Sequence, residues 1–354
     1  MKTMKSKFYS LALAAGMLSL TACSDDNTND SNNDKGNGIE NGSILKGTIT
    51  EDVTLKAGNT YKLSGEYIVE AGATLNIEEG VKIISVYDNI VDYILVKQGA
   101  KINAVGTPDK PIVMTSEKEE PGAWGGIHIC GKAHTNAEGG KGSSEIGGAV
   151  YGGNDDADNS GTLQYIRLEY TGFAFDEEHE ANGISFYGVG NGTIVDHCEA
   201  YKGSDDGFEF FGGSVNVSNM VVVSCSDDSF DWTEGWNGKG TDLVAYQEAK
   251  ATLGYDCDCL IEADNNENDN AATPVSHPVL KNLILAGNGE SKQGIRLRRG
   301  TQADIDNAKV CGKGQPLVVE SALTNASLKN GTSRLTNMTV TAALKSDGDY
   351  TNDD

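Results

Sequence analysis

Short runs of alternating apolar and polar residues recur along most of the chain, and the spacing of an amphipathic helix is nearly absent. Six four-residue segments share one pattern, in which an apolar residue is followed by a polar residue, then usually Asn, then another apolar residue. They are 163–166, 195–198, 217–220, 280–283, 305–308 and 335–338. Asn tolerates the left-handed backbone conformation. Its recurrence predicts that the chain turns the same corner at least six times.

A second series of short strands follows the first, at 183–186, 207–210, 229–232, 260–263 and 294–297. Their alternation places one apolar pair inside and projects the residues between outward. These outward residues are Ser185, Glu209, Asp231, Glu262 and Arg296. Each strand therefore contributes one side chain to an outer face.

A third family of repeats, at 57–61, 71–75 and 98–102, indicates that coiling begins near Thr48. Stacked coils of roughly 20 to 30 residues predict an all-β parallel β-helix, a solenoid that fills residues 47–354 as one domain. Long loops interrupt the coils at about 133–160 and 265–278. Such loops on a rigid scaffold are typical binding elements.

Several segments carry a resemblance to a known family: GATLNIEEGVKI, GTPDKPIVMTS, GAWGGIHICGKA, SDDGFEFFGG, IEADNNE and LRRGT. From about Gly47 to Gly312 the chain resembles a family of bacterial secreted and lipoprotein β-helices within the pectin-lyase-like superfamily. The resemblance implies a right-handed parallel β-helix. It implies no particular activity, since none is assigned to that family.

The first residues have the features of a secretory signal peptide, with a basic start and a short apolar run over residues 1–22. The ending Leu20-Thr21-Ala22-Cys23 resembles a bacterial lipobox, which implies lipidation of Cys23; a lone cysteine in an ordinary signal peptide is the alternative. Residues 23–46 are expected to form a disordered tether. Its acidic start resembles the surface-export signal of Bacteroidetes lipoproteins. We therefore expect a lipid anchor in the outer membrane, at the cell surface.

The chain carries 52 acidic and 28 basic residues, a formal net charge of −24. Loss of the signal peptide removes three lysines and makes the charge more negative. Such a field repels nucleic acids and anionic lipids and attracts cations. We expect a monomer that binds a glycan or another envelope component and meets the membrane through its anchor alone. The six cysteines after Cys23 show no zinc-site spacing, and most are expected in the core.

Two Ser-Asp-Asp triplets stand 22 residues apart, at 204–206 and 226–228. One coil of a β-helix separates them, so equivalent residues should lie roughly 4.8 Å apart. The predicted pairs are Asp205 with Asp227, Asp206 with Asp228, and Glu209 with Asp231. Two bare carboxylates at that distance repel by roughly 3 kcal/mol at an effective dielectric near 20. Several in a column need protons, a cation or hydrogen-bond donors.

An oxygen-only cluster favours calcium. The hypothesis is one or more Ca²⁺ ions on these six acids, with the four aspartates of the triplets as first choices. The alternative is that Ser-Asp-Asp is turn chemistry, each Asp bonding nearby backbone while it faces water. Segment 156–161 is a weaker candidate, because it copies only the first half of a calcium loop.

Superfamily relatives include calcium-dependent lyases with an arginine base and hydrolases with paired aspartates. Arg296, Arg298 and Arg299 are expected several coils from the acids, and a Gly-His-Gly motif is absent. No residue is therefore assigned a catalytic role, and the favoured function is non-catalytic binding on a calcium-stiffened face. A calcium-dependent polysaccharide lyase or glycoside hydrolase is the alternative, and an adhesin or spacer is a second.

Four residues form a possible ligand platform: Trp124, Trp236, Arg296 and Arg298. Both tryptophans stand between glycines, where a ring can be exposed and stack on a sugar. Packing under a neighbouring loop is equally compatible with that pattern.

Overall fold

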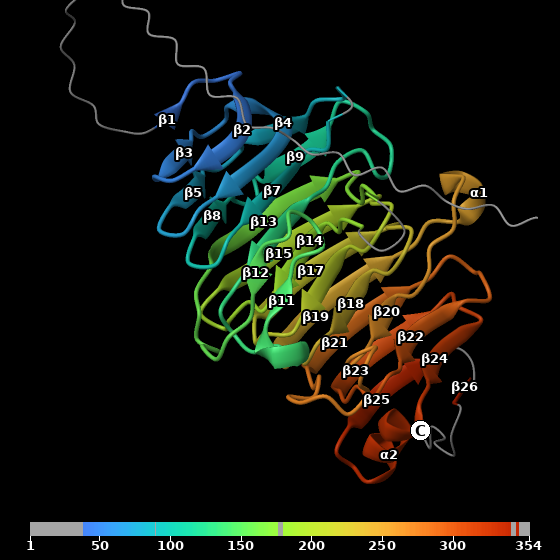
Figure 1. Ribbon diagram of the computed structural model, residues 1–354. Coiled ribbons are helices and arrows are strands. Elements are labelled where there is room, and N and C mark those ends of the chain that lie inside the picture. Colours follow the sequence, from blue (N-terminus) through green and yellow to red (C-terminus); the bar gives the residue numbers. More distant parts are fainter. Residues whose placement is uncertain (1–37, 89, 176–179, 341–344, 347–354) are drawn as a thin grey trace, which may run out of the picture. The chain divides into compact units, whose positions relative to one another are not determined.

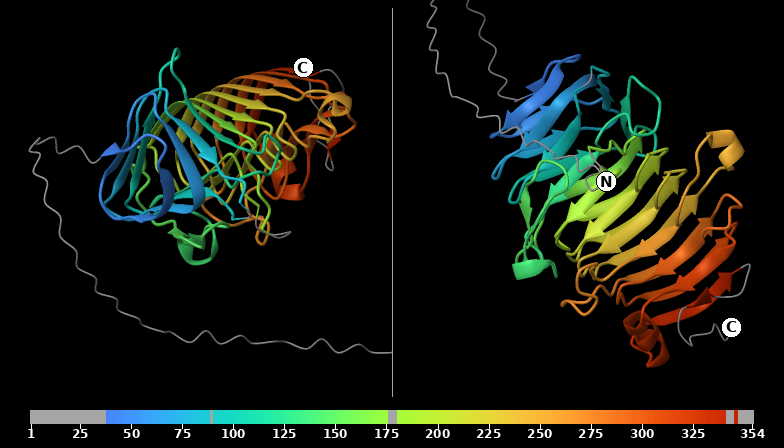
Figure 2. Two further views of the ribbon diagram at one scale, coloured as in Figure 1. Left: turned by 90° about the horizontal axis from the view of Figure 1, so that it is seen from above. Right: turned by 45° about the vertical axis from the view of Figure 1, so that its right-hand side comes forward.

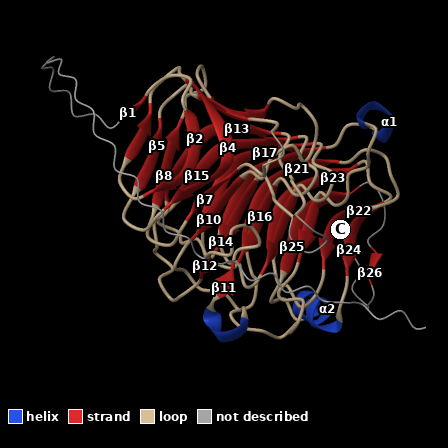
Figure 3. Cartoon of the chain, turned by 45° about the horizontal axis from the view of Figure 1, so that its top comes forward, coloured by secondary structure: helices blue, strands red, loops and turns tan. Residues whose placement is uncertain are grey.

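The computed structural model describes residues 38–340 except 89 and 176–179, together with strand 345–346, and they form a right-handed parallel β-helix (Figure 1). Twenty-four strands make one sheet in which every pairing is parallel, and consecutive coils stack along the axis (Figure 2). The predicted fold class is confirmed. Helices are short and lie at the edges of the solenoid (Figure 3), and no helix among the described residues is long and apolar enough to cross a membrane.

The first coils are built from nine strands: β1 (Gly38–Ile39), β2 (Ile44–Ile49), β3 (Val53–Leu55), β4 (Thr60–Val69), β5 (Thr74–Ile77), β6 (Lys82–Ser85), β7 (Tyr93–Val96), β8 (Lys101–Val105) and β9 (Ile112–Ser116). Strand β1 pairs with β3 and β2 with β4. Coiling therefore begins before residue 47, inside the segment expected to be a tether.

The later coils alternate long and short strands. The long strands are β13 (Gly161–Glu169), β15 (Ile194–Tyr201), β17 (Asn216–Val223), β19 (Lys239–Tyr246), β21 (Val279–Ala286), β23 (Asp304–Cys311) and β25 (Arg334–Val340). The short strands are β10 (Ile127–Cys130), β14 (Ile184–Tyr187), β16 (Phe208–Phe211), β18 (Phe230–Thr233), β20 (Ile261–Ala263), β22 (Gln293–Leu297), β24 (Gln315–Val319) and β26 (Lys345–Ser346). Outside the coils lie η1 (Glu138–Gly140), β11 (Gly142–Ser143), β12 (Val150–Tyr151), α1 (Lys250–Leu253) and α2 (Ala322–Lys329).

Each long strand bends at one residue in the left-handed backbone conformation. The corner residues, with φ between 51° and 60°, are Tyr165, His197, Asn219, Asp242, Asn282, Asn307 and Asn337. Six of them are the third residues of the predicted repeats, so the repeated corner is confirmed. The seventh, Asp242, was missed because its segment begins with Gly240 instead of an apolar residue.

Short amide side chains link successive corners. Asn282 Nδ2 donates to Asp242 Oδ1 at 3.0 Å, and Asn307 Nδ2 donates to Asn282 Oδ1 at 2.8 Å. An Asn both donates and accepts, so it can bond the coils above and below at the same time. The corner pattern thus has a conformational cause and a hydrogen-bonding cause.

The core is a stack of inward side chains from equivalent positions. Phe186 stacks on Phe210 with ring centroids 5.1 Å apart, and Phe208 stacks on Phe230 at 6.0 Å. Cys130, Cys198, Cys225, Cys257 and Cys259 are buried free thiols, as expected, whereas Cys311 is exposed. The interior is therefore a column of packed apolar side chains.

The tryptophan part of the predicted ligand platform is wrong. Trp124 and Trp236 are each 1% exposed, and their Nε1 atoms donate to the backbone carbonyls of Glu169 and Val215. The flanking glycines let the rings pack underneath: a Cβ on Gly238 would stand 2.6 Å from Trp236 Nε1. Both rings are core residues.

We predict that Asn282→Ala destabilises the domain more than Asn282→Gly does. Both changes remove the same hydrogen bonds, but Ala is strained at the corner φ of 60° and Gly is not. The difference in the free energy of unfolding should be about 1 kcal/mol in chemical denaturation. Equal losses in the two variants would show that the left-handed conformation contributes nothing to the corner.

Candidate functional site

One column of outward side chains runs along the short strands. Glu209 of β16 stands opposite Asp231 of β18, Asp231 opposite Glu262 of β20, and Glu262 opposite Arg296 of β22. The predicted stacking of Glu209 on Asp231 is therefore confirmed. The expectation that the arginines lie several coils away is wrong, because the intervening residues form α1 and long loops rather than extra coils. Only two coils separate Asp231 from Arg296.

The second aspartate of each triplet bonds the backbone of the following coil. Asp206 Oδ1 accepts from the Asp228 amide at 2.8 Å, and Asp228 Oδ1 accepts from the Cys259 amide at 2.6 Å. Both residues are buried, at 6% and 4% exposure. Hydrogen bonding of Asp to nearby backbone is thus part of the explanation for the Ser-Asp-Asp triplets. These two aspartates are buried, however, and bond the next coil instead of facing water.

The acids converge in three groups whose potential ligand atoms lie within 4.8 Å of one another. The groups are Asp205, Asp206 and Asp227; Asp206, Glu209 and Asp231; and Asp228, Cys259 and Glu262. They include all six acids proposed as calcium ligands, and Asp206 belongs to two groups. The first two groups, called here the turn cluster and the floor cluster, offer only oxygen and so fit a hard cation such as calcium.

Among the described residues, direct ion pairs with the column form only at its downstream end. Arg296 Nη1 lies 3.0 Å from Glu262 Oε1, and Arg298 Nε lies 2.7 Å from Asp264 Oδ1. Across the described part of the chain, no lysine or arginine forms an ion pair with any acid of the turn or floor cluster. The upstream acids therefore face one another without a protein cation in contact.

Burial raises the pKa of five acids well above their ordinary values, and neighbouring carboxylates raise it further. These acids are Asp205, Asp206, Glu209, Asp228 and Asp231. Desolvation penalises the charged form first, and the stacked like charges add to that penalty. Without a cation, the column favours holding protons.

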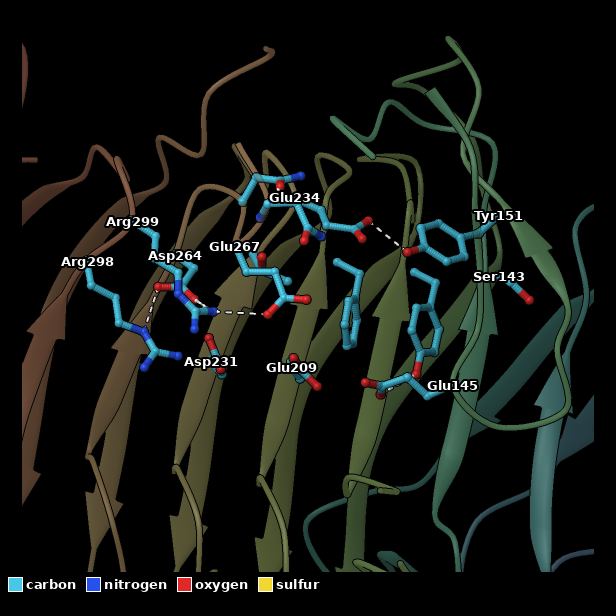
Figure 4. Close-up of a pocket in the computed structure, with 15 residues that line it drawn as sticks. Ser143, Glu145, Tyr151, Glu209, Asp231, Glu234, Asp264, Glu267, Arg298 and Arg299 are labelled. Atoms are coloured by element: carbon cyan, nitrogen blue, oxygen red, sulfur yellow. Dashed lines mark hydrogen bonds and ion pairs between the residues drawn. The ribbon is translucent and has the colours of Figure 1, made fainter. Parts of the chain in front are cut away.

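A cavity of about 320 Å³ lies over the floor cluster (Figure 4). Its floor is Glu209 and Asp231, and Arg298 and Arg299 close one end. The other lining residues come from the two long loops and the adjoining strands: Ser143, Glu145, Tyr151, Tyr187, Phe211, Thr233, Glu234, Asp264, Asn266, Glu267 and Asn268. The predicted platform residue Arg298 is therefore in the site, whereas Arg296 is not among the lining residues.

Loop 133–160 covers an apolar patch outside the coil and forms one wall of the cavity. Its Tyr151 ring lies 5.1 Å from that of Tyr187, which stacks on Phe211 at 4.4 Å. The Tyr151 hydroxyl donates to Glu234 Oε2 at 2.7 Å. The loop is therefore packed against the coils as well as hydrogen-bonded to them.

Buried amides join the two long loops. Asn136 Nδ2 donates to Asn265 Oδ1 at 2.8 Å, and Asn266 Nδ2 donates to Asn136 Oδ1 at 2.9 Å. The pairs are 129 and 130 residues apart in the chain. These contacts give no local sequence signal beyond the Asn-rich composition of the loop, so sequence reasoning missed the loop residues of the site.

The weaker calcium candidate, segment 156–161, forms hydrogen bonds at the base of loop 133–160. Asp156 Oδ1 lies 2.6 Å from His134 Nδ1, and Asp158 Oδ2 accepts from the Lys132 amide at 3.2 Å. His134 Nε2 lies 2.9 Å from the Gly235 carbonyl. These oxygens hold the base of loop 133–160.

The model of a family described as pectate-lyase-like β-helix domains matches residues 47–353. The chain belongs to this family. Among solved structures, the A-module of the mannuronan C-5 epimerase AlgE6 from Azotobacter vinelandii is similar at 13% identity and a TM-score of 0.32. That match covers 84% of this chain and 79% of the epimerase chain. No curated protein matches the sequence.

We predict that the metal-free pectate-lyase-like domain loses stability as pH rises. The five acids keep protons in the folded state after the unfolded chain has released them, near an ordinary pKa of about 4. Their contribution is therefore fully present at low pH and is lost as pH rises through the raised pKa values. Chemical denaturation with chelator, repeated at several pH values between about 5 and 8, measures the trend.

Two variants of Asp206 control for charge and hydrogen bonding. Asp206→Asn keeps an oxygen that accepts from Asp228 but removes a charge, so it should stabilise the metal-free domain at pH 8 by about 1 kcal/mol. Asp206→Ala also loses the acceptor and should destabilise by about 1–3 kcal/mol. Equal destabilisation by both, or a stability that does not depend on pH, would contradict the repulsion.

Proposed function

We propose that this protein binds a glycan of the cell envelope without cleaving it, and that calcium at the turn cluster stiffens the acidic face that carries the binding pocket. One observation carries the proposal. The Oδ1 atom of Asp231 is buried in the floor cluster and has no hydrogen-bond partner among the described residues. A buried carboxylate oxygen without a donor is costly, so it calls for a bound cation, ligand or proton.

Calcium fits the turn cluster best. Its three aspartates supply oxygen ligands alone, and calcium accepts the remaining oxygens from backbone and water. The third group fits poorly, because it includes a Cys259 thiol and its Glu262 already pairs with Arg296. A cation at the turn cluster would also relieve the repulsion on Asp206, which is shared with the pocket floor.

The pocket supports recognition of a short carbohydrate segment. Its volume of about 320 Å³ is at the lower end of the range for small-molecule sites. The side-chain amides of Asn266 and Asn268 and the hydroxyls of Ser143 and Thr233 line it, and such groups can bond sugar hydroxyls. The buried amide contacts between the loops preorganise the walls, which lowers the entropic cost of binding.

Catalysis by elimination or hydrolysis is less well supported. Burial alone would lower the pKa of Arg298, but its ion pairs with Asp264 and Glu262 raise that pKa instead, so it is a poor base. Glu209 and Asp231 have carboxylate oxygens within 4.8 Å of each other, too close for an inverting hydrolase and near the spacing of about 5 to 5.5 Å in retaining ones. A retaining nucleophile has to be ionised, however, and burial raises the pKa of both carboxyls well above their ordinary values. Binding is therefore the function that this geometry favours.

The envelope location rests on Cys23 and the signal peptide, which lie outside the described residues. We propose that a lipid on Cys23 anchors the chain in the outer membrane and that the β-helix stands at the cell surface. The acidic composition agrees with a partner that is neither nucleic acid nor anionic lipid.

We predict that millimolar calcium raises the melting temperature at pH 8. Binding to the folded state alone contributes about 2.7 kcal/mol when calcium is at 100 times its dissociation constant. The quadruple change of Asp205, Asp206, Asp227 and Asp228 to Asn should remove this rise. Asp242→Asn, which removes one charge at a corner outside the clusters, should keep it. An unchanged rise in melting temperature in the quadruple variant would show that calcium binds elsewhere.

A glycan-binding array run beside an activity screen on uronic-acid and neutral glycans tests the function itself. Retention of a glycan without release of products is the expected result. Release of unsaturated or hydrolysed products would show that the protein is a lyase or a hydrolase instead of a non-catalytic binder. Neither retention nor products would favour a structural spacer and overturn the proposal.

A further inference from the structure

The pocket carries an excess of negative charge that its arginines do not offset. Six acids line it, Glu145, Glu209, Asp231, Glu234, Asp264 and Glu267, against two bases, Arg298 and Arg299. Arg298 pairs with Glu262 and Asp264, and Arg299 lies 2.9 Å from Asp264 Oδ2 and 3.4 Å from Glu267 Oε2. Both arginines are thus paired with acids of the chain, so the pocket presents more negative than positive charge to a ligand.

The carboxylates on the floor of the cavity are not saturated with hydrogen-bond donors. Asp231 Oδ1 is buried and has no hydrogen-bond partner among the described residues, and Glu209 Oε2 accepts from Asn182 Nδ2 at 2.6 Å. These two carboxylates stand on neighbouring strands in register. A group with several N–H donors and a positive charge could bond both at once.

The wall beside the floor is aromatic. Tyr187 and Phe211 stack with an interplanar angle of 20°, and both line the cavity with Tyr151. The Tyr187 hydroxyl donates to Glu145 Oε2 at 3.1 Å, which places a carboxylate at the rim of the same wall (Figure 4). Tyr187 and Phe211 are only 0% and 8% exposed, so they form a buried apolar wall beside the carboxylates. Such a low-dielectric wall strengthens the attraction between the floor carboxylates and a cationic ligand.

We infer that the glycan recognised by this pocket carries a free amino sugar, whose ammonium group binds Asp231 and Glu209 beside the buried apolar wall of Tyr187 and Phe211. The inference rests on the proposed glycan binding and names the class of ligand. It separates the two cation sites: a metal belongs to the turn cluster, and the organic cation belongs to the pocket floor. Glycans are favoured over basic peptides because the two loops enclose a short cavity rather than an extended groove.

Calorimetric titration of the purified full-length chain, with calcium present, tests the inference. The probes are a β-linked glucosamine tetramer, the same tetramer fully N-acetylated, an oligouronate of equal length, and a tetralysine peptide. The glucosamine tetramer should bind at least tenfold more tightly than the N-acetylated one. Asp231→Asn and Glu209→Gln should each reduce this preference at least tenfold.

Two controls keep the variants interpretable. Asp304→Asn, on β23 outside the pocket, should leave the preference unchanged, and thermal unfolding should show that both pocket variants fold. Equal affinity for the two tetramers would overturn the inference and leave glycan binding intact. Binding of the oligouronate or of tetralysine alone would also overturn it, and binding of none of these probes, together with a blank glycan array, would remove the proposed function as well.

Discussion

The stacking of one coil on the next governs this molecule, because it places equivalent side chains roughly 4.8 Å apart whatever their chemistry. Repetition stabilises where the side chains attract one another. Phe208 stacks on Phe230, and Asn282 bonds its neighbours at the corner. Repetition of Asp and Glu has the opposite effect, since every acid faces another across the strands. The fold that aligns the core also concentrates charge.

The protein relieves this repulsion by different means along the column. Backbone amides bond Asp206 and Asp228, and arginines pair with the acids of the downstream coils. The turn and floor clusters lie upstream of the arginine pairs, and Asp206 belongs to both although a backbone amide bonds one of its oxygens. The site is therefore the segment of the column where internal compensation is incomplete. The two long loops enclose the same segment and turn a charged surface into a pocket.

Short-range patterns in the sequence predicted the solenoid, the repeated corner and the facing acids. Each of these depends on the spacing within one coil, which the repeats display directly. Features that depend on loop length could not be predicted in this way. Arg296 lies two coils from Asp231 because residues between them form loops, and the repeats do not reveal how many residues leave the coil.

Contacts between distant parts of the chain determine the features that the repeats do not display. Trp124 and Trp236 have the glycine neighbours of an exposed ring, yet both are buried in the main core, where Trp236 stacks on Phe210. Asn136 meets Asn265 across 129 residues, and no local pattern signals that pairing. The walls of the pocket are formed by such long-range contacts, whereas its floor is formed by residues of the repeated strands.

The central claim is that the stacked acids retain protons because no protein cation in contact neutralises them. Potentiometry in weakly buffered solution tests it directly, by counting the protons released as calcium is added near neutral pH. The account predicts proton release that accompanies binding, because the metal displaces protons from acids whose pKa is raised by burial. Saturation with calcium and no released protons would show that the acids are already ionised, and it would contradict the account.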